Sequence, residues 1–188
     1  MIARDALTLG VLAGGRGSRL GGCGKAWIER DGVSQIVRIA QRFEHDVAHV
    51  LVSANQDAAR FQAMGLDVVA DRVPDLGPLG GLDALAQACT TPWLLTVPVD
   101  LVFVDDGLLR TLASAGGQGA SVEDDDGPQP LVALWRVDAL RASFPRTDLS
   151  AQSLQTTLGM PRIRLNGVRF GNLNTFDDLA AVGATIPR

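Results

Sequence analysis

The chain has 188 residues, of which 46% are hydrophobic, and a formal net charge of −4 at pH 7. This length and apolar content suffice for one compact domain, so we expect residues 1–188 to form a single unit. A slightly negative chain with no run of Lys or Arg argues against a nucleic-acid-binding surface. No signal peptide or membrane-spanning apolar run is evident, so we expect a cytoplasmic protein with no nucleic-acid or membrane partner.

Short apolar runs alternate with amphipathic segments along the chain. The pattern predicts strands at 8–13, 49–53, 67–70, 93–97, 120–123, 131–135 and 168–170. It predicts helices at 34–44, 57–64, 80–89, 106–115, 137–143, 151–158 and 176–182. We therefore expect an α/β fold, a three-layer Rossmann-like domain with a mostly parallel central sheet and helices on both faces. Ligands of such sheets bind beyond the carboxyl ends of the strands, where the strand order reverses.

A glycine-rich loop follows the first predicted strand. Residues 12–25 read LAGGRGSRLGGCGK, and Lys25 is the only lysine of the chain. Glycines let backbone N–H groups approach an anion closely, while Arg19 and Lys25 add positive charge. The Walker A and dinucleotide patterns do not fit, because Ala26 follows the lysine and Leu20 stands where a third glycine belongs. The loop is predicted to bind phosphates in another way.

Acidic residues lie near the end of the predicted strand 93–97. Asp100 stands where a carboxylate could hold Mg²⁺ against nucleotide phosphates, although its spacing also fits a cap of the following segment. Asp105 and Asp106 precede an apolar helix and are expected to cap it. The acidic run 123–130 is expected to form an exposed turn between two strands.

Three other segments stand out beyond predicted strands or before a helix. The loop 71–81, DRVPDLGPLGG, is rich in Gly and Pro and fits either a ligand-binding loop or a plain connection. Asn55 follows the second strand, where it could contact a base or ribose or bond a neighbouring backbone group. Thr175 and Asp178 have the spacing of a capping box.

Together these segments resemble the molybdenum cofactor guanylyltransferase family of the nucleotidyltransferase superfamily, with a nucleotide-diphospho-sugar transferase-like fold. The matching segments, in chain order, are LAGG at 12–15, Arg19 with Gly21, Gly22 and Lys25, SAN at 53–55, Asp71, GPLGG at 77–81, VPVD at 97–100, QPLVAL at 129–134 and NLNT at 172–175. Three departures lie beside them: Gly24 replaces an Asp, Leu101-Val102 replaces Thr-Pro, and Phe176 replaces a Pro.

The resemblance implies an enzyme that transfers GMP from GTP to the phosphate of molybdenum-loaded molybdopterin, releasing pyrophosphate, with Mg²⁺ as cofactor. Other proteins of molybdenum cofactor biosynthesis or acceptor enzymes are its implied partners. Lys25, Arg19 and Asp100 are the implied catalytic residues, with Asp100 as metal ligand, and Asn172 and Asn174 lie towards the pterin. The implied nucleotide-binding residues are Leu12, Ala13, Gly14, Gly15, Lys25, Asn55, Asp71, Gly77, Pro78 and Gly81.

Two other functions fit the same residues. A related enzyme would transfer CMP to molybdopterin or a nucleotide to a sugar phosphate, because base choice depends on contacts that the motifs do not specify. A degenerate GTP-binding paralogue would act as a partner module. Gly24 and Leu101-Val102 favour the paralogue, whereas the presence of both Lys25 and Asp100 argues against it.

Overall fold

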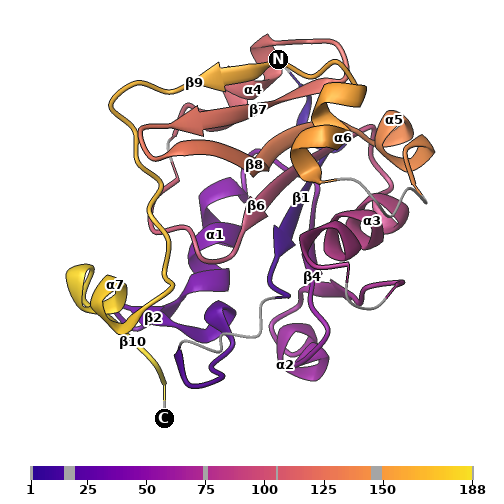
Figure 1. Cartoon of the computed structure of the whole chain (residues 1–188). Helices are drawn as coiled ribbons and strands as arrows, with labels where there is room; N and C mark the ends of the chain where they lie inside the picture. Colours follow the sequence, from indigo (N-terminus) through magenta and orange to yellow (C-terminus); the bar gives the residue numbers. More distant parts are fainter. Residues whose placement is uncertain (1, 15–19, 74–75, 105, 145–149, 188) are drawn as a thin grey trace.

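Seven strands form the central sheet of this computed structural model, which describes residues 2–14, 20–73, 76–104, 106–144 and 150–187 (Figure 1). The strand order is β5-β4-β1-β6-β8-β7-β9. In the chain these strands are β1 Leu7–Leu12, β4 His49–Ser53, β5 Asp67–Val69, β6 Trp93–Pro98, β7 Gly119–Asp124, β8 Gly127–Arg136 and β9 Arg162–Arg164. Only β8 runs antiparallel to its neighbours among these seven strands, which confirms a mostly parallel sheet.

The strand order reverses between β1 and β6. From β1 the chain adds β4 and β5 on one side, and it then crosses to place β6 on the other side. Both strands are almost continuously apolar, as expected for strands covered on both faces. Their carboxyl ends therefore form the crevice in which such sheets bind ligands.

Helices cover both faces of the sheet, which confirms the three layers. The helices are α1 Gln35–Phe43, α2 Ala58–Gln62, α3 Pro78–Ala88, α4 Leu108–Ser114, α5 Val137–Ala142, α6 Ala151–Thr157 and α7 Phe176–Ala181. Apolar side chains of α1 and α4 join one core cluster, and those of α3, α5 and α6 join a second. Gly10 of β1 lets α3 pack closely, because a Cβ there would lie 3.0 Å from Leu85.

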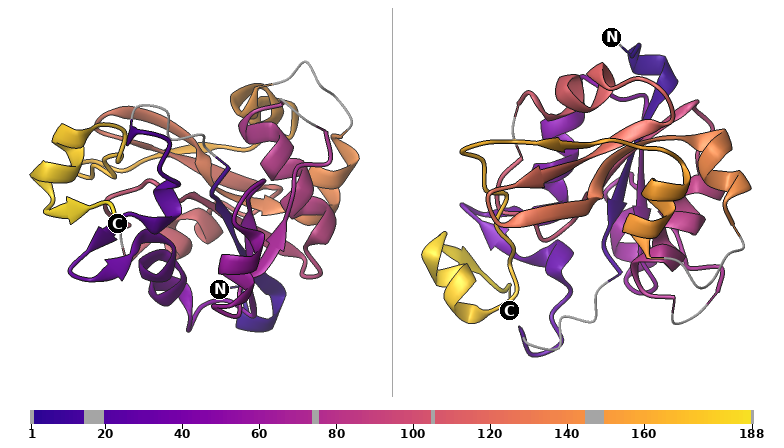
Figure 2. Two further views of the ribbon diagram at one scale, coloured as in Figure 1. Left: turned by 90° about the horizontal axis from the view of Figure 1, so that it is seen from below. Right: turned by 45° about the horizontal axis from the view of Figure 1, so that its top comes forward.

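A second, small sheet lies to one side of the main sheet, together with α7 (Figures 1 and 2). It consists of β2 Glu29–Arg30, β3 Val33–Ser34 and β10 Ala184–Thr185, in the order β10-β2-β3. The apolar pattern of the sequence does not predict this small sheet. Asp31 and Gly32, with φ of 55° and 74°, form the β2–β3 turn, a pairing typical of tight hairpins. Their two-residue strands are too short to produce a periodic signal.

Two sequence-based expectations in the second half of the chain are wrong. Residues 168–170 are not a strand, because the backbone of Val168 and Phe170 bonds to Asp125 and to residues 102–103 rather than forming a ladder. The strand in this region is β9, which pairs with β7. The run 123–130 is not one exposed turn, because β7 continues to Asp124 and β8 already begins at Gly127.

Helix starts differ in how well the sequence predicted them. The capping box at α7 is confirmed: the Thr175 hydroxyl accepts from the backbone N–H of Asp178, whose carboxylate accepts from the N–H of Thr175. Asp106, however, is not a cap. The helix α4 follows Gly107, and Asp106 instead forms an ion pair with Arg42 of α1 at 2.9 Å. Asp105 lies outside the described residues.

Candidate active site

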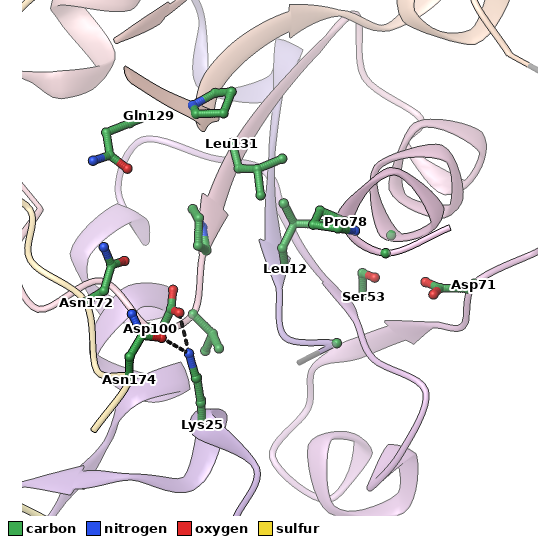
Figure 3. A pocket seen from close by; sticks show the side chains of 16 residues that line it. Leu12, Lys25, Ser53, Asp71, Pro78, Asp100, Gln129, Leu131, Asn172 and Asn174 are labelled. Carbon is green, nitrogen blue, oxygen red and sulfur yellow. Dashed lines mark hydrogen bonds and ion pairs between the residues drawn. The ribbon is translucent and has the colours of Figure 1, made fainter. Parts of the chain in front are cut away.

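A cavity of about 500 Å³ lies beyond the carboxyl ends of β1 and β6, at the point where the strand order reverses. Figure 3 shows two opposite walls, with Ser53, Asp71 and Pro78 on one side and Lys25, Asp100 and the C-terminal asparagines on the other. The full lining is Leu12, Gly14, Lys25, Ser53, Asp71, Gly77, Pro78, Gly81, Pro98, Val99, Asp100, Gln129, Pro130, Leu131, Asn172 and Asn174.

Lys25 is the centre of a small polar network in this cavity. Its Nζ donates to Oδ2 of Asp100 at 2.7 Å and to Oδ1 of Asn174 (Figure 3). The side chains of Lys25 and Asp100 are only 16% and 21% exposed, so water screens their attraction less than on an open surface. The ammonium group has three N–H donors, and these two contacts leave one for a ligand.

A group of stacked side chains supports the turn that carries Lys25. The 3-10 turn Lys25–Trp27 buries Trp27, whose indole N–H donates to Oδ2 of Asp57 at 2.7 Å. The guanidinium of Arg60 lies 3.8 Å from the centre of the Trp27 ring, and Phe61 packs beside the same ring. A Cβ at Gly24 would lie 3.0 Å from Trp27, so a glycine suits this close packing.

The C-terminal segment completes the wall around Asp100. Leu101 and Asn172 form an antiparallel bridge, and the N–H of Leu173 donates to the carbonyl of Asp100 at 2.9 Å. This backbone pairing places Asn172 and Asn174 at the cavity, beside Lys25. Asp178 also accepts from the N–H of Asn174, which joins the start of α7 to this wall.

The opposite wall is built by the start of α3 and the end of β4. Asn55 and Asp71 are joined twice: the Asn55 amide donates to the Asp71 carboxylate, and the Asp71 N–H donates to Asn55, both at 2.9 Å. Asp71 lies against Gly80 at the N-terminal end of α3, where a negative charge is favoured. At Gly81, a Cβ would lie 2.5 Å from Oγ of Ser53, so only glycine fits without displacing this side chain.

The structure brings together ten of the residues expected at the site: Leu12, Gly14, Lys25, Asp71, Gly77, Pro78, Gly81, Asp100, Asn172 and Asn174. Ala13 and Asn55 line a smaller neighbouring pocket of about 200 Å³, and Asn55 reaches the main cavity only through Asp71. Gly15 and Arg19 lie outside the described residues.

Six lining residues had been assigned no binding role: Ser53, Pro98, Val99, Gln129, Pro130 and Leu131. All six belong to segments on which the family resemblance rests. For Gln129, the available signal is a polar side chain that directly precedes the apolar run 130–135 of β8.

Within the residues that the structure describes, no helix combines the length and the apolar character needed to span a bilayer. Within the same ranges, no three or more His, Cys, Asp or Glu side chains gather into a group that could hold a metal ion by themselves.

Comparison with known proteins gives a consistent assignment. The family described as "MobA-like NTP transferase domain" matches residues 9–159. A molybdenum cofactor guanylyltransferase of Cupriavidus necator is 34% identical over 193 residues, which covers 95% of this chain and 97% of that protein. A molybdenum cofactor guanylyltransferase of Ralstonia nicotianae is 34% identical over 197 residues, which covers 95% of this chain and 97% of that protein.

Solved structures share the fold at low identity. The molybdopterin-guanine dinucleotide biosynthesis protein A of Archaeoglobus fulgidus has a TM-score of 0.66 at 18% identity, over 93% of this chain and 96% of that one. A putative glucose-1-phosphate thymidylyltransferase of Bacillus anthracis has a TM-score of 0.76 at 12% identity, over 94% of both chains.

Proposed function

The chain belongs to the MobA-like NTP transferase family, and we propose that it transfers GMP from GTP to the phosphate of molybdenum-loaded molybdopterin. An oxygen of the molybdopterin phosphate attacks the α-phosphorus of GTP. The bond between the α-phosphorus and its bridging oxygen to the β-phosphate breaks, and pyrophosphate leaves. The products are a guanine dinucleotide of molybdopterin and pyrophosphate.

The observation that carries this proposal is the position of Lys25. The only lysine of the chain lies at the cavity, and its ammonium group is held between Asp100 and Asn174. Nucleotidyl transfer depends mainly on in-line positioning and on neutralising charge at the phosphates. The ammonium group of Lys25 carries a positive charge and keeps one N–H donor that Asp100 and Asn174 do not use. It can therefore neutralise and position an oxygen of a triphosphate.

Asp100 is the residue that would hold Mg²⁺. Magnesium takes oxygen ligands and is usually bound by one or two carboxylates together with substrate phosphates and water, which fits the Asp100 carboxylate on the Lys25 side of the cavity. Lys25 engages Oδ2, so Oδ1 is the atom that would contact the ion. When bound, Mg²⁺ supplies further charge neutralisation at the triphosphate.

The wall around Asp71 is the proposed guanosine site. Asp71 is fixed by Asn55, and an ionised carboxylate can only accept hydrogen bonds. It suits the N–H groups of guanine or the hydroxyls of ribose. Leu12 and Pro78 add apolar surface on the same side of the cavity for the face of the base (Figure 3).

Isothermal titration with GTP, CTP and ATP, each with and without Mg²⁺, tests this function. We expect GTP to bind most tightly and Mg²⁺ to strengthen its binding. An assay with GTP and molybdenum-loaded molybdopterin should then release pyrophosphate. Preference for CTP or ATP would instead assign the chain to a related transferase, and GTP binding without turnover would favour a binding module. Absence of nucleotide binding would contradict the proposal.

A further inference from the structure

Asp124 is a buried carboxylate that joins two segments of the cavity wall. It ends β7, and its side chain is completely buried. Oδ1 accepts from the N–H of Asp126 at 3.0 Å and from Nε2 of Gln129 at 3.1 Å, while Oδ2 accepts from the N–H of Phe170 at 2.9 Å. Gln129 lines the cavity, and Phe170 precedes Asn172 and Asn174 of the same wall.

These contacts fix the charge state of Asp124. Burial by itself would raise the pKa of its carboxyl group, but the hydrogen bonds from Phe170, Gln129 and Asp126 outweigh burial and hold the pKa below its ordinary value. Two of the three donors are backbone N–H groups, which cannot become hydrogen-bond acceptors. Both oxygens of Asp124 therefore act only as acceptors.

The charge state of Asp124 determines which way the amide of Gln129 faces. A carboxylate can pair only with the N–H₂ end of an amide, so Nε2 of Gln129 must face Asp124. Oε1 of Gln129 consequently lies on the other side of the amide, available to the cavity that this residue lines (Figure 3). The cavity wall thus offers Oε1 of Gln129 as a hydrogen-bond acceptor, and the buried Asp124 carboxylate determines its orientation.

Asn174 is oriented in the opposite sense by the same reasoning. Lys25 is a donor only, so the atom of Asn174 that it contacts must be Oδ1. The N–H₂ group of Asn174 then remains for other partners. The wall formed by Gln129, Asn172 and Asn174 therefore has a fixed polarity, with a hydrogen-bond acceptor at Gln129 and a donor beside Lys25.

We propose that Gln129, oriented by the buried Asp124, recognises an N–H donor on a heterocyclic ring of the co-substrate, and so selects the molecule that receives the nucleotide. The inference rests on the proposed function and specifies its second substrate: an N–H-bearing heterocycle with a phosphate. The phosphate would lie towards Lys25 and the donor N–H of Asn174, and the ring towards Gln129. Asp124 is a positioning residue, because it acts through Gln129 and does not itself line the cavity.

Steady-state kinetics of the full chain with GTP and molybdenum-loaded molybdopterin test the inference. Gln129→Met keeps the length of the side chain and removes its amide. We expect the KM for molybdopterin to rise about 10- to 100-fold, since a bound N–H would lose its partner, while the KM for GTP stays unchanged. Gln118→Met is the matched control, because Gln118 is exposed beyond the opposite end of β7.

Asp124→Asn tests the positioning role separately. The asparagine cannot accept at both former oxygens, so the orientation of Gln129 is no longer imposed, and we expect the KM for molybdopterin to rise here too. In the double variant the combined effect should be smaller than the product of the single effects, because both changes remove the same contact. Titration with GTP shows whether each variant keeps a folded nucleotide site.

The outcomes separate this inference from the proposed function. If the unmodified protein turns over but Gln129→Met leaves the KM for molybdopterin unchanged, the role of Gln129 is refuted while the function stands. An equal rise in the KM values for both substrates would also refute it, since Gln129 would then merely shape the whole cavity. If the unmodified protein releases no pyrophosphate with molybdopterin, the proposed function fails, and the inference with it.

Discussion

At the scale of single residues, the side-chain type at position 25 suits its contacts in the cavity. Every other basic residue of the chain except its two histidines is arginine, yet at this position a compact ammonium group is held between a carboxylate and an amide. A guanidinium is planar and larger, so it could not keep both contacts and also direct one N–H into the cavity in the same way. A compact ammonium group therefore suits the two oxygen contacts that Lys25 makes here.

Replacing Lys25 by Ala should lower kcat/KM by roughly 30- to 900-fold. This range corresponds to about 2–4 kcal/mol of transition-state stabilisation, typical for the loss of one preorganised electrostatic group. Pyrophosphate release measures the effect, and Arg110→Ala, which removes an exposed cation from α4, is the control. Equal rates for the lysine variant and the control would show that Lys25 does not take part in the proposed phosphate site.

Asp100→Asn should abolish Mg²⁺-dependent turnover and leave the fold intact. The amide keeps the size of the side chain but lacks the charge that attracts the ion. Titrating activity with Mg²⁺ and recording circular dichroism separates the two effects, with the exposed Asp138→Asn of α5 as control. Unaltered Mg²⁺ dependence would show that Asp100 serves only as the ion-pair partner of Lys25.

At the scale of elements, α3 is fitted to β4 by Gly81. Replacing a glycine by Ala within a helix normally stabilises it by about 0.5–1 kcal/mol. Here the new Cβ would meet Ser53 at 2.5 Å and Leu12 at 2.9 Å. Such overpacking destabilises a protein by about 1–3 kcal/mol, which exceeds the gain in helix propensity. We therefore expect Gly81→Ala to reduce the free energy of unfolding by about 1–2 kcal/mol. Urea denaturation measures it, and a gain in stability would contradict the packing described here.

The β7–β8 hairpin and the start of α7 should make stability sensitive to acid. The pKa of Asp124 is lowered in the fold, and that of Asp178 is lowered chiefly by the N–H of Asn174. A lowered pKa adds stability above the unfolded value, about 3.9 for Asp, and this is lost as pH falls through the folded value. The urea concentration at the midpoint of unfolding should therefore decrease as the pH is lowered below about 4. In the Asp124→Asn variant the midpoint should depend less steeply on pH. An equally steep dependence in the variant would show that Asp124 does not contribute to the acid sensitivity.

The main elements could be predicted from sequence because their signals are local. Strand β1 is a continuous apolar run, and α7 has its capping box written into Thr175 and Asp178. Residues 168–170 misled the prediction because Val168 and Phe170 are apolar and alternate with a polar residue, yet their hydrogen bonds go to a turn and a loop distant in sequence. Such pairings depend on the assembled fold and leave no periodic pattern in the chain.

At the scale of the whole molecule, the site was predictable where it follows strand ends. Lys25 and Asp100 were expected at one edge because parallel strands end together, and both line the cavity. Gln129 could not be assigned a role in this way, since it lies on the antiparallel strand β8. The pairing of β7 with β8 shifts register between Ser121 and Val122, and a shift of one residue decides which face a side chain takes.

Nucleotide binding should stabilise the whole chain in a single unfolding transition, because the cavity joins segments from residue 12 to residue 174. At about 100 times the Kd, GTP with Mg²⁺ should add about 2.7 kcal/mol. For a chain of this size that corresponds to a rise in Tm of about 5–11 °C, measured by scanning calorimetry. CTP at the same concentration should give a smaller shift. Two separate transitions, of which only one responds to GTP, would contradict a single cooperative unit.

The contact between Lys25 and Asn174 also has a consequence for how the protein is made. The two residues are 149 positions apart, so at about 5–20 residues per second the lysine is synthesised roughly 7 to 30 s before its amide partner. Throughout that interval the nascent chain contains the Asn55–Asp71 wall of the cavity but lacks the asparagine that contacts Lys25. A chain released early by a stalled ribosome would keep Lys25 and Asp100 yet lack the segment that holds them. Translation must therefore pass residue 174 before the ammonium group of Lys25 can be held on both sides.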